Sequence, residues 1–154
     1  FGSGNFDVGY KLCDLVCKHA QQEPSDAIPI LISKSVALGR EDKQTDSLTT
    51  SITAAQSIGI YPKSGMIWKI MKEMVWLKFY FQRHTDDELL SLPFITDSKI
   101  LLSMKLLNLI IYRGIATDHV TEWLMATVKM IRATIKHGIC KHTSMAFSFL
   151  SAMM

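Results

Sequence analysis

The sequence has few cysteines and no long apolar run that is free of charged residues. Its three cysteines are an odd number, which argues against a disulfide framework and is typical of a reducing compartment. The longest apolar stretches, residues 66–81 and 100–112, both contain lysine and are poorly suited to span a bilayer. No basic segment followed by an apolar run marks a signal peptide. We therefore expect a chain of the cytoplasm or another reducing intracellular compartment.

Charge of either sign is also scarce. Charged residues make up 20% of the chain, the net charge is +3, and the lysines and arginines are spread out. Because nucleic-acid binding proteins carry dense basic patches or aromatic RNA-binding motifs, we expect no nucleic-acid partner. With 48% hydrophobic residues in 154 positions, the chain can bury one core, and we expect a single domain over residues 1–154. The first residue is Phe1, which suggests a processed chain or a fragment of a longer one.

Strand-like alternation is almost absent, and helical periodicity dominates. The pattern predicts an all-α fold with helices at about residues 6–21, 27–38, 47–58, 66–83, 86–92, 98–113, 119–137 and from 142 or 143 onward. Glycines at positions 39, 59, 114 and 138 are predicted to end helices. Since helices joined by short turns pack antiparallel, we expect a stack of helical hairpins: a bundle or part of a tetratricopeptide-like solenoid.

Two helices carry specific packing expectations. The helix at 6–21 has an apolar stripe that should face its neighbour, formed by Val8, Leu12, Leu15 and Val16. The helix at 66–83 is apolar nearly all round, so we expect it to be covered on several sides. Trp68 and Trp76 cannot both follow one apolar stripe, so at least one of them should contact another helix layer or a partner.

A glycine-rich segment at residues 2–12 has some features of a phosphate-binding loop. Such a loop places lysine directly after its last glycine and follows a strand, and here Tyr10 separates Gly9 from Lys11 with no strand before them. The dinucleotide-binding fingerprint also lacks its third glycine. We therefore interpret residues 4–5 as a turn between helices and Gly9 as a site of close helix approach.

The tripeptide Cys-Lys-His occurs twice and raises the question of a zinc site. Cysteine and histidine are ligands that zinc prefers, and the four candidates are Cys17, His19, Cys140 and His142. A Cys-x-His spacing on a helix directs the two side chains apart, and the site needs two distant segments to meet. The alternative is that the cysteines are small core residues. We expect no metal and no cofactor.

Two further groups place histidine beside carboxylates. His84 precedes an acidic segment, but the spacing of Thr85 and Glu88 is that of a helix capping box, which explains the acids structurally. His119 and Glu122 lie one turn apart, yet no second pair of this kind exists on another helix, as a di-metal bundle requires. No nucleophile-elbow motif is present. We expect no catalytic residues, and a helical enzyme or ligand-binding bundle is the third interpretation.

Nine methionines and three tryptophans are the most unusual count in the composition. Most should fill the core, but methionine and tryptophan also suit adaptable binding surfaces. A basic stripe at helical spacing on residues 119–137 is typical of a solvated face, with phosphate or an acidic partner as the alternative. The candidate partner-binding residues are Trp68, Met71, Trp76, Lys129, Arg132 and Lys136.

Four short segments share their pattern with one known family. They are residues 4–12 (Gly-Asn-Phe-Asp-Val-Gly-Tyr-Lys-Leu), 28–31 (Ile-Pro-Ile-Leu), 92–97 (Leu-Pro-Phe-Ile-Thr-Asp) and 136–138 (Lys-His-Gly) with the Ser-Met-Ala-Phe that follows. Together they resemble the degenerate tetratricopeptide-like arm of large multidomain sensor kinases with a STAND-type, AAA-like ATPase. In that family the last two segments precede the first, whereas here they follow it. The resemblance implies a scaffold or protein-binding arm, and no Walker lysine is present to imply an ATPase.

The predicted function is therefore a non-enzymatic protein-interaction or scaffold module, similar to the arm of a signalling ATPase or kinase. The alternative is a structural accessory subunit of a large assembly, with membrane association left open, which the high apolar content favours. Both interpretations expect a protein partner and no small-molecule substrate.

Overall fold

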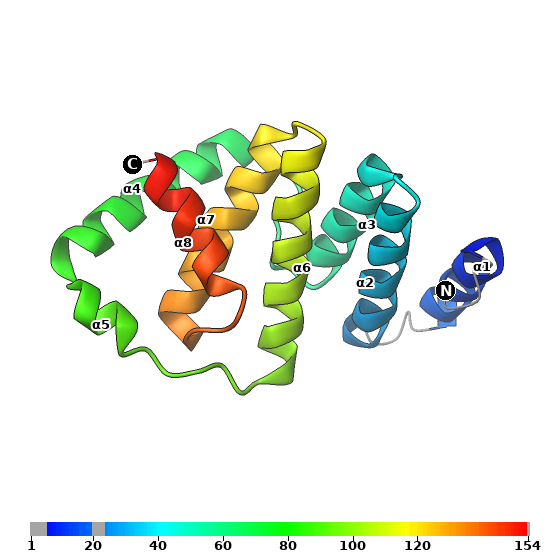
Figure 1. Ribbon diagram of the computed structural model, residues 1–154, viewed down its shortest axis with the longest axis horizontal. Helices are drawn as coiled ribbons and strands as arrows, with labels where there is room; N and C mark the ends of the chain where they lie inside the picture. Colours follow the sequence, from blue (N-terminus) through cyan, green and yellow to red (C-terminus); the bar gives the residue numbers. More distant parts are fainter. Residues whose placement is uncertain (1–5, 20–23, 154) are drawn as a thin grey trace.

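The computed structural model describes residues 6–19 and 24–153, and these form an all-α fold (Figure 1). The helices are α1 (Phe6–His19), α2 (Pro24–Arg40), α3 (Gln44–Ser57), α4 (Met66–Arg83), α5 (Asp86–Leu90), α6 (Ser98–Ala116), α7 (Val120–His137) and α8 (Thr143–Met153). Apart from one parallel bridge between Phe94 and Ile139, this part of the chain has no β-structure. None of the described helices is both long enough and apolar enough to cross a membrane. The turn predicted at residues 4–5 lies outside the described residues.

The helices form a row in which neighbours in space are mostly neighbours in sequence. Figure 1 shows α1 at one edge, followed by α2, α3, α6 and α7, with α8 and α4 on the far side of α7. The helix α4 departs from this order, because it follows α3 in sequence but packs against α7. Tyr61, in the connection before α4, is buried and donates a hydrogen bond from its hydroxyl to the carbonyl oxygen of Glu122, 3.1 Å away. This contact leads the chain past the start of α7 and positions α4 beside it.

The core is centred on α6 and α7, and it extends from α2 to α8. Its fully buried members on these two helices include Met104, Leu106, Ile110, Ile111, Met125, Val128, Met130 and Ile131. Gly114 is buried where α6 approaches α7, and a Cβ added there would lie 2.9 Å from the Cβ of Trp123. The absence of a side chain at Gly114 therefore permits the close packing of the two central helices.

Glycine ends helices at two of the four predicted positions. Gly59 and Gly138 follow α3 and α7 with φ of 75° and 110°, as expected for residues that terminate helices. The same prediction was wrong for Gly39 and Gly114, which lie inside α2 and α6. Both are packing positions, since the side chain of Arg113 lies against Gly39 and Trp123 lies against Gly114. Only Gly114 requires a small residue, because it meets the Cβ and backbone of Trp123, whereas the atoms beside Gly39 belong to the flexible end of the Arg113 side chain.

Buried hydroxyl groups join α2 to α3. The Ser35 Oγ lies 2.9 Å from the Ser47 Oγ and 2.7 Å from the Ser51 Oγ, and all three side chains are buried. Because each hydroxyl has hydrogen-bond partners, the cluster avoids the cost of burying polar groups unpaired. These contacts explain how the Ser- and Thr-rich helix α3 packs tightly with few large apolar residues.

Candidate functional site

The helix α4 has one buried face and one face open to solvent. Glu73 and Leu77 are its buried residues, and they point toward α7. On the open face the exposed fractions are 68% for Ile67, 74% for Trp68, 55% for Met71, and 56% for both Val75 and Phe79. The expectation that this helix is covered on several sides was only partly right: α4 packs against α7, and Phe81 contacts Phe147 of α8 with ring centroids 6.2 Å apart, but the opposite face is uncovered.

Four of these exposed side chains form a continuous line, which we call the α4 stripe: Trp68, Met71, Val75 and Phe79. Spacings of three, four and four residues place side chains on one face of a helix. At 1.5 Å per residue, the stripe is about 16 Å long. Contiguous apolar surface of this kind is typical of interaction sites and unusual elsewhere on a soluble surface.

The exposed charged residues of α4, which lie around the α4 stripe, are all positive. They are Lys69, Lys72, Lys78 and Arg83. The Lys69 ammonium donates a hydrogen bond to the carbonyl oxygen of Ser64, 2.8 Å away. Glu73 is the single acidic residue of α4, and it lies on the opposite, buried face. The open face of α4 is therefore apolar and cationic.

The buried carboxylate of Glu73 joins α4 to α7 through two ion pairs. One of its oxygens lies 3.1 Å from the Lys129 ammonium, and the other accepts a hydrogen bond from the Arg132 guanidinium. Burial by itself would raise the pKa of Glu73, but the hydrogen bonds from Arg132 and Lys129 outweigh burial and hold the pKa below its usual value. The guanidinium of Arg132 also lies 4.7 Å from the ring centroid of Trp76, as in a cation–π contact.

We expect Glu73→Gln to lower the free energy of unfolding at pH 7 by about 1 kcal/mol, since Lys129 and Arg132 are partly exposed and can be rehydrated. The folded-state pKa of Glu73 lies below the ordinary 4.5, so its stabilisation is present above about pH 4.5 and is lost as the pH falls through the folded-state pKa. The difference between wild type and variant should therefore shrink on acidification. Urea unfolding at stepped pH measures it, and a difference independent of pH would contradict this account.

The structure separates the predicted partner-binding residues into two groups. Trp68 and Met71 belong to the open face of α4, whereas Lys129 and Arg132 pair with Glu73 and Trp76 lies against Arg132. Lys136 is exposed on α7. Two cations of the predicted basic stripe are thus engaged within the protein.

Three residues of this site, Glu73, Val75 and Phe79, were not among the functional residues predicted from the sequence. Two signals could have found them. Val75 and Phe79 lie seven and eleven residues after Trp68, on the same helix face, and Glu73 is the lone acid in a helix with four cationic residues.

A stack of side chains continues from Trp76 along α4. The rings of Trp76 and Tyr80 have centroids 5.3 Å apart, and those of Tyr80 and His84 are 4.1 Å apart. The Nδ1 of His84 lies 2.8 Å from a carboxylate oxygen of Glu88. The predicted capping box of α5 is confirmed, because the Thr85 hydroxyl accepts from the Glu88 N–H and the Glu88 carboxylate accepts from the Thr85 N–H. His84 and Glu88 thus have structural roles at the junction of α4 and α5.

The four zinc-ligand candidates do not converge in the described part of the chain. Cys17 is in α1 at one edge of the row, and Cys140 lies between α7 and α8 near the other (Figure 1). The side chain of His19 lies outside the described residues. Among the side chains that the structure places, no group of three or more His, Cys, Asp or Glu residues is arranged to hold a metal ion.

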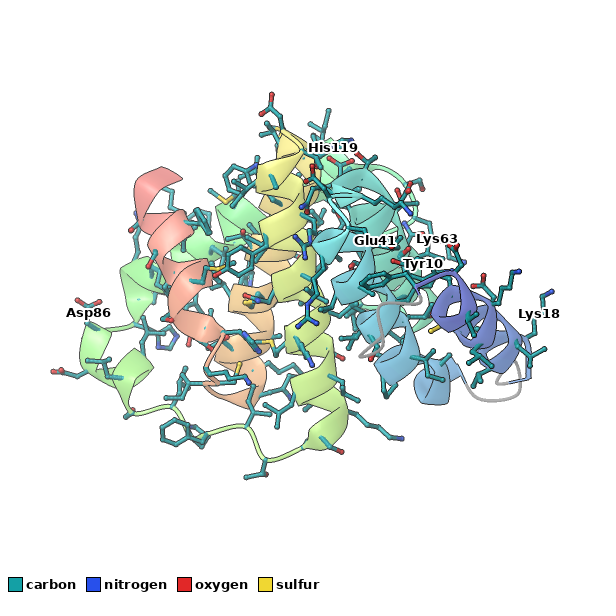
Figure 2. The ribbon with its side chains drawn as sticks, turned by 45° about the vertical axis from the view of Figure 1, so that its right-hand side comes forward. Tyr10, Lys18, Glu41, Lys63, Asp86 and His119 are labelled. Carbon is teal, nitrogen blue, oxygen red and sulfur yellow. The ribbon has the colours of Figure 1, made fainter. Side chains whose placement is uncertain are left out.

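The second histidine–carboxylate pair has separate partners. The Nδ1 of His119, a residue labelled in Figure 2, lies 2.8 Å from the hydroxyl and 2.9 Å from the carbonyl oxygen of Thr117. The carboxylate of Glu122 accepts from the Thr121 hydroxyl at 2.6 Å. The side chains of His119 and Glu122 therefore each hydrogen-bond to a nearby threonine at the α6–α7 turn and not to one another.

The apolar stripe of α1 faces away from α2, contrary to the sequence expectation. Leu12 and Leu15 are both more than half exposed, while Cys13 is buried against α2. Figure 2 shows Tyr10 beside Glu41, and the Tyr10 hydroxyl donates to the Glu41 carboxylate at 2.9 Å. Burial and this carboxylate raise the pKa of Tyr10 to about 12, so the phenol stays protonated. The row of helices consequently exposes an apolar face at each end.

An apolar hollow of about 610 Å³ lies between the start of α6 and the segment after α7. Its lining includes Phe94, Leu101 and Ile139, with Lys105 and His142 among the polar residues. Burial, followed by the charges of Lys141 and Lys105, lowers the pKa of His142. Among the residues that the structure describes, no aspartate or glutamate lines this hollow.

In the comparisons with known proteins, no family model, curated protein or solved structure matches this chain. The resemblance to the arm of sensor kinases stays a prediction. The candidate site is accordingly defined by the α4 stripe and by the exposed lysine and arginine residues of α4 around it.

Proposed function

We propose that this protein is a non-enzymatic, helical protein-interaction module that binds a partner through the α4 stripe. The observation that carries the proposal is the line of four large apolar side chains, each more than half exposed, on one helix face. Covering apolar surface contributes about 25 cal/mol for each Å² removed from water. Tryptophan and phenylalanine are residues that often dominate binding energy when a partner covers them.

The way α4 is attached supports this function. Leu77 and Glu73 hold the helix on α7 from the opposite side, so the α4 stripe is presented on a preformed backbone. A preformed surface loses little conformational entropy when a partner binds. The stripe can therefore bind without any rearrangement of the helix row.

The exposed apolar face of α1 favours a scaffold with two ends. Leu12, Leu15 and Val16 are open to solvent on the helix that is farthest along the row from α4. A protein with an apolar face at each end can join two neighbours, as a repeat arm does. An accessory subunit of a large assembly, the alternative function, would use the same two faces.

Selection from a displayed library of random helical peptides tests the proposed function. We expect Trp68→Ala and Phe79→Ala each to lower the affinity for the selected peptides at least about tenfold, which corresponds to 1.4 kcal/mol. Losses of this size are typical of residues at the centre of an interface. Tyr112→Ala, at an aromatic residue of α6 that is also 56% exposed, is the matched control and should leave their affinity unchanged. Circular dichroism should show the same helix content in all three variants. If the library yields no binder, or if the binders tolerate both α4 variants, the proposed function is wrong.

A further inference from the structure

We infer that the partner segment bound by the α4 stripe is an acidic amphipathic α-helix of another protein. This inference rests on the proposed function and adds the chemistry of the partner. Three features of α4 carry it: the shape of the stripe, the sign of the charges around it, and the position of Lys72 within the apolar face.

The shape of the α4 stripe fits a helix lying along it. Its side chains follow one another at spacings of three and four residues, the pattern by which two helices interlock their side chains. The stripe extends over three helical turns, from Trp68 to Phe79. A partner helix with apolar residues at positions i, i+3 or i+4, and i+7 would cover it.

The charges specify an acidic partner. The exposed cations Lys72, Lys78 and Arg83 border or interrupt the α4 stripe, and no carboxylate of α4 is exposed beside them. Glu73 cannot serve as their counter-charge, because it is buried on the opposite face and paired with Lys129 and Arg132. Aspartate or glutamate on the flanks of the partner helix would complement these cations and set its orientation.

Two other occupants fit less well. A second copy of this chain, bound stripe to stripe, would place the cations of the two α4 helices opposite one another, because the nearest exposed carboxylates, those of Asp86, Asp87 and Glu88, lie on α5 past the end of the stripe. Lys72 follows Trp68 by four residues and precedes Phe79 by seven, so it lies on the same face of α4 as the stripe. If this face inserted into an anionic membrane, the Lys72 side chain would enter the membrane together with the apolar side chains. A helix can instead place one carboxylate opposite Lys72.

The first test compares two synthetic helical peptides with identical apolar positions, one flanked by glutamate and the other by lysine. We expect the glutamate peptide to bind at least about tenfold more tightly at low salt, and its advantage to shrink as salt screens the charges. The fluorescence of Trp68 should report binding, because its exposed indole becomes buried. The peptides selected from the library should likewise be enriched in Asp and Glu beside their apolar positions.

Charge reversal on the protein provides the second test. The double variant Lys72→Glu/Lys78→Glu should reverse the preference in favour of the lysine peptide, whereas Lys18→Glu, at an exposed lysine of α1, should leave it unchanged. Equal binding of both peptides, still lost in Trp68→Ala, would overturn the acidic partner and leave the proposed function standing. Failure of every helical peptide would overturn both. Tighter binding to phosphatidylserine vesicles, or a dimer in sedimentation that Trp68→Ala abolishes, would overturn the inference in favour of a membrane or a second copy.

Discussion

Replacing Gly138 with alanine is expected to reduce the free energy of unfolding by about 3 kcal/mol or more. Gly138 ends α7 with φ 110° and ψ −174°, a conformation that is essentially restricted to glycine. An added Cβ would also lie 2.1 Å from the carbonyl oxygen of Pro93. That oxygen accepts a hydrogen bond from the Ile139 N–H at 2.8 Å, so relief of the clash would break the bridge that ties the α5–α6 connection to α7. Urea unfolding followed by circular dichroism measures the loss.

Gly59→Ala is the matched control for this prediction. Gly59 also has a positive φ, 75°, but an added Cβ would have no atom within 4 Å. We expect a cost of about 1 kcal/mol from the left-handed backbone conformation alone. If the two variants lost the same stability, contact with Pro93 would not be the constraint at Gly138.

Leu77→Ala should have the second large effect on stability, a loss of about 3 kcal/mol. The Leu77 side chain is completely buried on the face of α4 that meets α7, and its removal leaves a cavity between the two helices. Truncation of a buried leucine costs both the apolar transfer energy and the energy of the cavity. Chemical denaturation of the variant and the wild type under identical conditions measures the difference.

Phe79→Ala, two residues away on the same helix, is the control for Leu77→Ala. Phe79 is 56% exposed, so its truncation should change the free energy of unfolding by no more than about 0.5 kcal/mol. A large aromatic residue that contributes little to folding is available for binding. A loss as large as that of Leu77→Ala would mean that Phe79 is packed inside the protein, and the α4 stripe would lose one of its anchors.

The positions of the helices could be predicted well from local signals. Helix α4 begins at Met66 and ends at Arg83 as expected, and the capping box of Thr85 and Glu88 begins α5. These signals work because helix formation and capping depend on residues within four positions of one another. The glycines show where local reasoning fails. Gly39 and Gly114 lie inside helices with Arg113 and Trp123 packed beside them, and the sequence alone does not reveal those neighbours.

The direction of each apolar face could not be predicted in the same way. Periodicity shows that a helix has an apolar face, but it does not show whether another helix lies there to cover it. The stripe of α1 was expected to face a neighbour and α4 to be covered on several sides, yet the α1 stripe and one whole face of α4 are exposed. Only part of the candidate site was therefore visible beforehand: Trp68 and Met71 were selected for their residue type, whereas Val75 and Phe79 became significant once the open face of α4 was known.

The sequence by itself determined the all-α class, the extent of most helices and the cationic, apolar character of α4. The tertiary structure decided which face of α4 is open. Tyr61, just before α4, bonds to Glu122 of α7 across 61 positions of sequence. Glu73, the one acidic residue of α4, bonds to Lys129 of α7 across 56 positions. Together these two contacts attach α4 to α7. Pairings over such distances depend on how the whole chain packs, while helix formation depends on neighbours within a turn.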